Sequence, residues 1–403
     1  MRSLLSVAEA LERVLEHAAP LPAEEVPLSA AAGLVLAYPV KARRTQPPAD
    51  LSAMDGYAVR ASDVADPPVK LKVIGEVAAG RPFTHPVGPG EAARIFTGGV
   101  MPQGADAVVI QEHAKRDGEY VTLEKSSPKG RHIRVQGLDF KAGEVLLKAG
   151  HRLTPRDLAL AAGMNHPFVP VHRRPKIALF ATGDELVPPG CEPAAGQIVS
   201  SNNFALEALA RSEGADVTDL GIVGDRLDDT VDAVRRARVG GADILVTSGG
   251  ASVGDYDLVQ KAFTAEGMKL SFWRLALRPG RPLMYGRLGA MDVLGVPGNP
   301  VSAFVCGFLF LVPLIRLLMG RTDLERPIES ALLGVDLPEN DERADYMRAT
   351  LTNGPQGLVV TPFPIQDSSM MAPLAKADCL MIREPYDRAA KIGEPCRIVK
   401  FEH

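Results

Sequence analysis

The stretch Lys176-Ile-Ala-Leu-Phe-Ala-Thr-Gly-Asp-Glu185 decides the fold class, because it is an uninterrupted apolar run that ends in a glycine turn. The same pattern recurs at Asp243-Ile-Leu-Val-Thr-Ser-Gly-Gly-Ala-Ser-Val-Gly-Asp255 and at Met291-Asp-Val-Leu-Gly-Val-Pro-Gly-Asn-Pro300. Apolar strands that alternate with helical patterns are typical of a parallel, doubly wound α/β sheet. We therefore predict an α/β domain of this kind over residues 176–326.

The elements of this domain follow from hydrophobic periodicity. Continuous apolar runs predict strands, and apolar residues at helical spacing predict the helices between them. The predicted strands cover residues 177–181, 217–223, 243–247 and 291–296, and the predicted helices cover residues 203–213, 228–238, 256–266 and 301–319.

The flanking segments predict three further parts of the chain. Residues 27–148 alternate short apolar runs with Gly and Pro, which is typical of an inserted β domain. Residues 327–403 show the same pattern and predict a C-terminal β-barrel-like domain. Residues 1–26 and 149–175 each contain one helical pattern, so we expect them to form a small discontinuous helical or mixed domain.

Composition excludes several classes of protein. Apolar residues make up 46% of the 403 residues, which is enough to build hydrophobic cores. The net charge of −4 lacks the basic excess of a nucleic-acid-binding protein. The four cysteines are far apart in the sequence, which argues against a zinc ribbon or a disulfide scaffold and favours a reducing compartment.

The sequence also predicts neither a signal peptide nor a membrane segment. Glu9, Glu12 and Arg13 interrupt the first apolar stretch. The longest apolar run, residues 303–315, is shorter than a bilayer span and contains Pro313. We therefore expect a cytoplasmic protein.

Three glycine-containing loops are the strongest candidates for a ligand site. Ligands of open α/β sheets bind beyond the carboxyl ends of the strands, where these loops would converge. Gly249, Gly250 and Gly298 would let the backbone approach a ligand, and the helix N-termini that follow favour phosphate. The alternative is that they are ordinary βα turns, which three loops in register make less favourable. The sequence contains neither a Walker A motif nor G-x-G-x-x-G.

Acidic residues accompany these loops. Asp184 and Glu185 follow the first strand, Asp225 follows the second, and Asp255 and Asp257 follow the third. Carboxylates beside a phosphate site suit Mg²⁺, which needs few protein ligands. The alternative is that they are solvated helix N-caps. For Glu185 and Asp257 we favour the functional interpretation.

A basic loop supplies candidate ligands for an oxyanion. Arg274, Arg278 and Arg281 lie within a Pro- and Gly-containing segment, and guanidinium groups bind oxyanions through paired hydrogen bonds. The alternative is a solvated turn. Arg348 and Ser368-Ser369 of the tail are weaker candidates for the same pocket. A covalent mechanism is not favoured, since there is no G-x-S-x-G motif and no histidine between positions 173 and 402.

Five ordered motifs resemble one known family. They are Ser52-Ala-Met-Asp55-Gly-Tyr-Ala58, Arg94-Ile-Phe-Thr97-Gly98, Thr182-Gly-Asp-Glu-Leu186, Ser248-Gly-Gly-Ala-Ser-Val-Gly254 and Pro297-Gly-Asn-Pro-Val-Ser302. Taken singly, the first two are also compatible with structural turns. Together they resemble the molybdopterin molybdenumtransferases, the bacterial counterparts of the gephyrin E domain, over essentially the whole chain.

The resemblance implies a function in molybdenum cofactor synthesis. Members of this family insert molybdate into adenylated molybdopterin and release AMP with the assistance of Mg²⁺. The resemblance further implies four domains per subunit, with the discontinuous domain as linker and dimerisation domain, and an elongated homodimer. In this dimer the inserted β domain of one subunit would close over the site of the other. Implied protein partners are the molybdopterin adenylyltransferase and acceptor molybdoenzymes, with no nucleic acid and no membrane.

The resemblance also implies roles for single residues. The catalytic set is Asp55, Thr97, Asp139, Glu185, Asp225 and Asp257, of which Glu185, Asp225 and Asp257 would bind the metal. The molybdopterin-binding set is Thr182, Gly183, Asp184, Ser248, Gly249, Gly250, Ser252, Gly254, Pro297, Gly298, Asn299 and Pro300. The molybdate-binding set is Arg274, Arg278, Arg281, Ser302, Arg348 and Ser368.

The chain departs from the family pattern at four positions. Arg278 and Arg281 replace two lysines, and Arg and Lys are not equivalent at an oxyanion site. Leu138 replaces an acid, and Asp367 replaces a glycine. Two alternatives therefore stay open, a non-catalytic scaffold of the gephyrin type and a molybdopterin adenylyltransferase. The sequence does not distinguish molybdate from tungstate.

Overall fold

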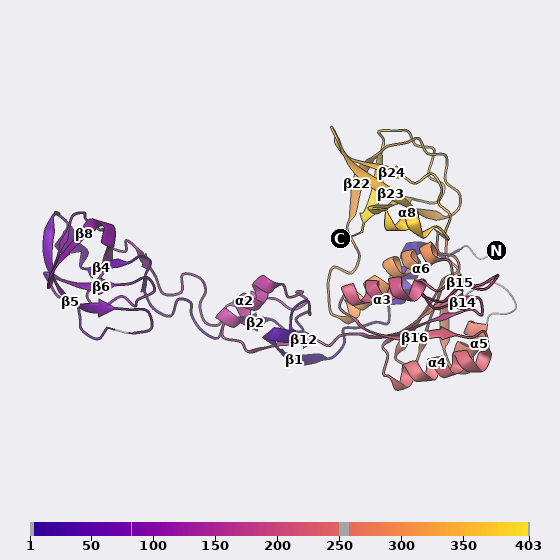
Figure 1. Cartoon of the computed structure of the whole chain (residues 1–403), viewed down its shortest axis with the longest axis horizontal. Coiled ribbons are helices and arrows are strands. Elements are labelled where there is room, and N and C mark those ends of the chain that lie inside the picture. Colours follow the sequence, from indigo (N-terminus) through magenta and orange to yellow (C-terminus); the bar gives the residue numbers. More distant parts are fainter. Residues whose placement is uncertain (1–3, 82, 250–257, 402–403) are drawn as a thin grey trace.

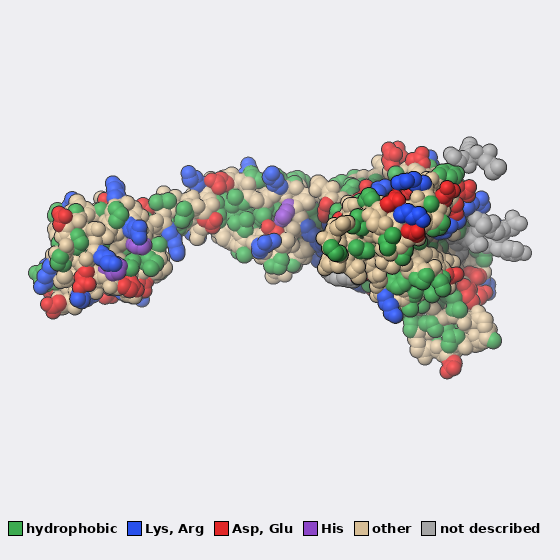
Figure 2. Space-filling model, turned by 90° about the horizontal axis from the view of Figure 1, so that it is seen from above, with side chains coloured by type: hydrophobic (Ala, Val, Ile, Leu, Met, Phe, Trp, Pro, Cys, Tyr) green, Lys and Arg blue, Asp and Glu red, His purple; other side chains and the backbone are tan. Residues whose placement is uncertain are grey.

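The computed structural model describes residues 4–81, 83–249 and 258–401. The molecule is elongated, with a β module at one end and a broad part at the other (Figure 1). The broad part contains an α/β unit and a C-terminal barrel. A small connecting unit that contains α2 (Pro155–Gly163) lies between the two ends. On the face shown in Figure 2, basic and acidic side chains of the described residues are interspersed.

The α/β unit is built on a six-stranded sheet with the order β16-β13-β17-β21-β20-β18. Four strands are parallel, as predicted: β16 (Asp216–Val223), β13 (Lys176–Thr182), β17 (Ile244–Ser248) and β21 (Met291–Val296). Two antiparallel strands that the sequence analysis did not include complete the sheet, β20 (Met284–Leu288) and β18 (Lys269–Phe272). β20 joins β21 through a tight hairpin, which needs no crossover helix, and β18 pairs with β20 at the edge of the sheet.

Helices cover both faces of this sheet. On one face, α3 (Asn202–Ser212) packs in a core with the long helix that begins at Pro300. On the other face, α4 (Leu227–Val239) and α5 (Leu258–Ala265) bury apolar side chains, Val234 and Phe263 among them. This arrangement confirms the doubly wound architecture (Figure 1).

The long helix contains α6 (Pro300–Cys306), a π-helical turn η4 (Gly307–Leu311) and α7 (Val312–Leu318). Gly307 lies directly against α3, since a Cβ there would be 2.7 Å from Leu206 Cδ2. By length and composition residues Pro300–Leu318 could cross a membrane, but 83% of their most apolar window is buried inside the protein. We therefore interpret this segment as the core helix of the α/β unit.

The first helix lies on the α/β unit. In α1 (Val7–Leu15), Ser6 and Glu9 form a capping box at the start of the helix. The Tyr285 hydroxyl donates to the carbonyl of Val14 at 3.0 Å. By contrast, β1 (Ala23–Pro27) pairs with β12 (Phe168–His172) in the connecting unit. The structure thus places α1 on the α/β unit and β1 in the connecting unit. This differs from the prediction that residues 1–26 belong entirely to one discontinuous domain with residues 149–175.

The distal β module contains a six-stranded sheet with the order β7-β4-β6-β5-β9-β8. Close packing at its centre requires glycine at position 56, because a Cβ there would be 2.1 Å from the carbonyl oxygen of Val109. The strands are β4 (Gly56–Val59), β5 (Val69–Val77), β6 (Glu91–Ile95), β7 (Ala107–Ile110), β8 (Ala114–Asp117) and β9 (Tyr120–Leu123). Shorter pairs connect it to the rest of the molecule: β2 (Val40–Lys41) with β11 (Val145–Leu147), and β3 (Leu51–Ser52) with β10 (Ile133–Arg134).

The C-terminal barrel closes through five strands, which confirms the predicted β-barrel-like end of the chain. The strands are β22 (Ile328–Leu333), β23 (Ala344–Gly354), β24 (Gly357–Pro362), β25 (Cys379–Arg383) and β26 (Pro395–Lys400), and β25 pairs with both β26 and β23. A short strand of the α/β unit, β19 (Leu277–Arg278), pairs with β23 from outside the barrel.

Candidate functional site

The predicted ligand loops leave the sheet side by side. In the parallel register Ala181 lies beside Ser248, and Ser248 lies beside Val296. Thr182, Gly249 and Pro297 therefore leave three neighbouring strands at the same edge. This is the carboxyl edge of the parallel strands, where α/β sheets bind their ligands.

Two acids link the loops after β13 and β16. The Thr182 hydroxyl donates to Asp225 Oδ1 at 2.8 Å. The backbone N–H of Asp225 donates to Asp184 Oδ1 at 3.0 Å, and the N–H of Asp184 is 3.4 Å from Asp225 Oδ2. Gly183 has a φ of +150°, and a Cβ there would be 2.5 Å from Glu185 Oε2. Asp184, Glu185 and Asp225 are thus grouped at one exposed corner of the sheet.

Glycine is also required where the β17 loop crosses β13. Gly249 has a φ of +89°, and a Cβ on it would be 2.5 Å from the carbonyl oxygen of Thr182. A Cβ on Gly298 would be 3.6 Å from the Cα of Gly249, so the β17 and β21 loops lie in contact. The backbones of three loops therefore lie close together with little side-chain bulk between them.

Asn202 is a site residue that the sequence analysis did not identify. Its Nδ2 donates to Ser248 Oγ at 2.7 Å and to the carbonyl oxygen of Gly298 at 2.8 Å. It thereby joins the β17 and β21 loops from the first turn of α3. The polar run Ser200-Ser201-Asn202 before an amphipathic helix was the only signal in the sequence.

Several predicted ligands lie outside the described residues. They belong to the segment that continues the β17 loop into α5. The residues concerned are Gly250, Ser252, Gly254, Asp255 and Asp257.

The C-terminal barrel reaches the Pro297–Pro300 loop. Asn299 Nδ2 donates to Ser368 Oγ at 2.8 Å, and the N–H of Val301 donates to the carbonyl oxygen of Ser368 at 3.1 Å. Ser302 is buried in the first turn of α6. The structure therefore brings Ser368 to the predicted pterin loop.

Arg348 holds the barrel segment that carries Ser368. Its side chain is buried, and its guanidinium donates to the carbonyl oxygens of Met370 at 2.7 Å and Asp367 at 2.9 Å. Its Nε donates to Gln366 Oε1 at 3.3 Å. These contacts fix the segment from Gln366 to Met370. In this structure Arg348 therefore holds the backbone on both sides of Ser368.

The three arginines of the basic loop differ in their surroundings. Arg278 is engaged by acids of the barrel, with Nε donating to Asp345 Oδ1 at 2.6 Å. Arg274 and Arg281 are exposed and have no hydrogen-bond or ion-pair partner in the part of the chain that the structure describes. The free positive charge of this loop therefore lies on Arg274 and Arg281.

Two further predicted catalytic residues, Asp55 and Thr97, lie far from these loops. Asp55 accepts two hydrogen bonds from Thr97 in the distal β module. The N–H of Asp139 donates to the carbonyl oxygen of Gln46 near the β3–β10 pair. The strands that flank Asp55 and Thr97 lie at the opposite end of the molecule from β16 and α3 (Figure 1). Within a single chain, Asp55 therefore does not come close to Glu185 and Asp225 of the same predicted catalytic set.

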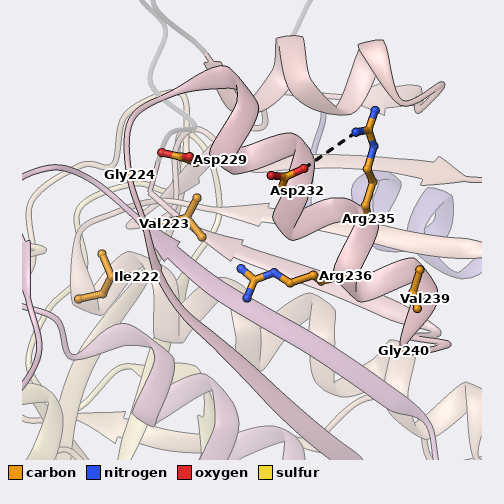
Figure 3. A pocket seen from close by; sticks show the side chains of 9 residues that line it. All are labelled: Ile222, Val223, Gly224, Asp229, Asp232, Arg235, Arg236, Val239 and Gly240. Atoms are coloured by element: carbon orange, nitrogen blue, oxygen red, sulfur yellow. Dashed lines mark ion pairs between the residues drawn. The ribbon is translucent and has the colours of Figure 1, made fainter.

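A large hollow of about 960 Å³ runs along the outer side of α4 and the end of β16. Figure 3 shows its lining, including the Asp232–Arg235 ion pair at 3.9 Å. One end reaches Gly224 and Asp229, next to the acidic corner, and the remainder extends to Val239 and Gly240. Two acids and two arginines line it, so it has no single sign of charge that would select an anion. We place the site at the loops rather than in this hollow.

The acidic corner offers a metal ion few protein ligands. Within residues 4–81, 83–249 and 258–401, no group of three His, Cys, Asp or Glu side chains is close enough together to hold one. Asp184 and Asp225 nevertheless present carboxylates from adjacent loops, and each carboxylate retains lone pairs beyond its hydrogen bonds. This partial set fits Mg²⁺, which commonly binds one or two carboxylates together with substrate phosphates.

Comparison with known proteins identifies the family. Residues 5–164 match the MoeA N-terminal region (domain I and II), residues 178–317 match a probable molybdopterin-binding domain, and residues 330–401 match the MoeA C-terminal region (domain IV). The chain is 34% identical to the molybdopterin molybdenumtransferase of Haemophilus influenzae, with 99% of both chains covered. The chain belongs to the molybdopterin molybdenumtransferase (MoeA) family.

Other relatives agree with this assignment. The molybdopterin molybdenumtransferase of Nostoc sp. is 41% identical, with 81% of this chain and 77% of that protein covered. A crystal structure of the molybdopterin biosynthesis MoeA protein from Pyrococcus horikosii has a TM-score of 0.86 at 30% identity and covers 100% of both chains. The protein is therefore a transferase of molybdenum cofactor biosynthesis. The region that matches the probable molybdopterin-binding domain, residues 178–317, contains the loops described above.

Proposed function

We propose that the enzyme inserts molybdate into adenylated molybdopterin, with release of AMP and the assistance of Mg²⁺. The observation that carries this proposal is the junction of three loops at the carboxyl edge of the sheet. There the acidic pair Asp184 and Asp225 adjoins the glycine backbone at Gly249 and Gly298. Backbone N–H groups suit phosphate, and carboxylates suit a divalent ion that bridges to it.

The chain's own residues bind and orient the substrates in this proposal. The loops Thr182–Glu185, Ser248–Gly254 and Pro297–Pro300 hold the pterin and its pyrophosphate. Glu185, Asp225 and Asp257 hold Mg²⁺, which when bound neutralises charge on the pyrophosphate. Arg274 and Arg281, with Ser302 and the Ser368 segment, hold the oxyanion next to the dithiolene. Catalysis then depends on positioning and electrostatics, since no enzymic nucleophile is required.

A second copy of the chain completes the site in this proposal. Asp55 and Thr97 flank β4 and β6 of the distal β module, at the opposite end of the molecule from α3 and β16, so a partner subunit would supply them together with Asp139. Exposed apolar side chains in the connecting unit, namely Tyr38, Val145 and Phe168, support burial of this region in a homodimer. We also propose a cytoplasmic location, which agrees with four cysteines that are all free of disulfides.

Two further functions stay as alternatives. A scaffold of the gephyrin type would not need the grouped acids Asp184 and Asp225. A molybdopterin adenylyltransferase would not need the barrel contact between Ser368 and Asn299. The adenylyltransferase and the acceptor molybdoenzymes are the protein partners that the proposed reaction requires, because one supplies the substrate and the others receive the product.

The deciding experiment measures AMP release from adenylated molybdopterin with Mg²⁺, with and without molybdate. Release that depends on molybdate is the expected result. Tight binding without release would favour a carrier, after tungstate has been tried as the oxyanion. Conversion of free molybdopterin with ATP would favour the adenylyltransferase.

A further inference from the structure

Asp345 of the barrel engages the basic loop of the α/β unit more fully than an ordinary surface ion pair. Arg278 Nε donates to Asp345 Oδ1 at 2.6 Å, and Arg278 Nη2 donates to Asp345 Oδ2. Arg278 Nη1 donates to Asp341 Oδ2 at 3.0 Å, and Nη2 also reaches Asn340 Oδ1 at 3.2 Å. These contacts use four of the five N–H donors of a guanidinium group.

Burial and backbone pairing strengthen this contact. Asp345 is 7% exposed, so its negative charge is balanced mainly by Arg278. Leu277 and Arg278 pair in parallel with Ala344 and Asp345, and the N–H of Ala344 donates to the carbonyl oxygen of Ala276 at 3.0 Å. The α/β unit and the barrel are thus joined through both backbone and side chains at one point.

The same point controls the position of Arg281. The two arginines are separated by Pro279 and Gly280, and a Cβ on Gly280 would be 2.6 Å from Leu277 Cδ2 and 3.0 Å from Cys306 Sγ. The short segment therefore packs tightly against α6 and β19. A displacement of Arg278 would carry Arg281 with it.

We infer that Asp345 and Arg278 form an interdomain latch that positions Arg281 for the oxyanion, and that Arg278 is not itself an oxyanion ligand. This inference rests on the proposed function for its substrate, and it makes Asp345 and Arg278 positioning residues. Two carboxylates already neutralise Arg278, which leaves Arg281 as the free cation of the segment. The latch needs the planar fork of arginine, since a lysine ammonium cannot bind both oxygens of Asp345 along two parallel bonds.

The test uses three variants: Asp345→Asn, Arg278→Lys and the double variant that carries both changes. Each is compared with the control variant Asp336→Asn. Asp336 is a matched control, because it is an exposed acid of the same barrel whose carboxylate binds Lys391 at 2.8 Å and the N–H of Ile392, and not Arg278. The first measurement is the molybdate concentration for half-maximal AMP release. We expect both single variants to raise it about tenfold or more, the effect typical of losing a residue that orients a ligand. The maximal rate at saturating molybdate should change much less.

The double variant separates a latch from a direct ligand. For a latch, its molybdate requirement equals that of the single variants, because either change opens the same contact. If Arg278 bound the oxyanion directly, Arg278→Lys would keep the charge and change little. Asp345→Asn would then unmask that charge and lower the molybdate requirement. Either of these last two results overturns the inference.

A second measurement does not depend on the proposed reaction. Hydrogen exchange of the Ala344 amide, in the protein without substrate, should be faster in Asp345→Asn and unchanged in Asp336→Asn. Unchanged exchange in Asp345→Asn would refute the latch, whatever the enzyme does with molybdate. Faster exchange in an enzyme that releases no AMP would support the latch and reject the proposed function.

Discussion

The carboxylate of Asp55 accepts two hydrogen bonds from Thr97, one from the backbone N–H and one from the hydroxyl, both at 2.7 Å. The bond from the Thr97 backbone contributes most to lowering the pKa of Asp55 below its usual value, so this acid is ionised at neutral pH. The pair lies in the distal β module, far from the acidic corner at Asp184 and Asp225 (Figure 1). In the function that we propose, this acid and the acidic corner belong to one site that forms between two subunits.

Mixing two inactive variants tests this arrangement. Asp55→Ala and Asp225→Ala should each abolish turnover alone. If the site forms between subunits, a heterodimer of the two has one site with Asp55 and Asp225 both intact and one site lacking both. Random reassembly makes half of the dimers mixed, so about a quarter of the wild-type activity should return.

The control is a mixture of Asp225→Ala with Glu185→Ala. These two residues lie in the same α/β unit, so no mixed dimer restores a complete site and activity should stay absent. A mixture of Asp55→Ala and Asp225→Ala that also stays inactive, although mixed dimers are detected by mass spectrometry, would place both acids in one chain.

Gly249→Ala should impair ligand binding by shifting the β17 loop. The φ of +89° is strained for alanine, and the new Cβ would lie 2.5 Å from the carbonyl oxygen of Thr182. We expect a local cost of about 1–3 kcal/mol, measured as weaker binding of adenylated molybdopterin. The control is Gly289→Ala, where φ is +67° but nothing lies within 4 Å of the new Cβ. Equal binding losses in the two variants would show that conformational strain, and not the contact with Thr182, is responsible.

The stability of the α/β unit depends on one buried acid. Glu213 is 3% exposed and accepts hydrogen bonds from Arg316, Arg321 and Arg326. Glu213→Gln should lower the free energy of unfolding by about 3–5 kcal/mol, because it removes the carboxylate that pairs with the buried guanidinium of Arg316. Glu329→Gln, which removes an exposed pair with Lys400, should cost no more than about 1 kcal/mol. Urea denaturation at neutral pH measures both.

The pH dependence of the same variant gives a second test. Burial alone would raise the pKa of Glu213, but the hydrogen bond and charge of Arg316, with Arg321 and Arg326, produce a net lowering. Its stabilisation is therefore complete above the usual glutamate pKa of about 4.3. It is lost as the pH falls through the lower pKa of the folded state. The difference in unfolding free energy between wild type and Glu213→Gln should shrink in that acidic range, and a constant difference would contradict this assignment.

Sequence patterns predicted those elements whose burial is visible in a short stretch of sequence. The parallel strands β13, β17 and β21 are apolar throughout because both faces are buried, and this property is visible in a short window. The strand β23 is not visible in a short window, because buried Asp345 and Arg348 interrupt its apolar pattern. Their burial is explained only by partners elsewhere in the chain.

For the site as well, local motifs could be predicted and contacts between distant residues could not. Loop glycines and acids were predicted from motifs, and the structure places Thr182, Asp184 and Asp225 together. The surroundings of Arg278 could not be predicted, because its main partner lies 67 residues later and in another part of the fold. The contacts of Arg348 with backbone carbonyls were equally invisible, since a carbonyl carries no sequence signal.

The side-chain amide of Asn202 joins the β17 and β21 loops, so the arrangement of both loops depends on this one residue. Asn202→Ala removes the hydrogen bonds to Ser248 Oγ and to the carbonyl oxygen of Gly298. At about 0.5–1.5 kcal/mol per hydrogen bond, we expect roughly tenfold weaker binding of adenylated molybdopterin. Asn202→Asp should bind more weakly still, since its carboxylate cannot donate to Gly298 and repels the pyrophosphate. Isothermal titration gives both affinities, with Asn353→Ala as control, because Asn353 is exposed on β23 of the barrel. Binding by Asn202→Asp that equals or exceeds binding by Asn202→Ala would mean that the pyrophosphate does not lie beside these loops.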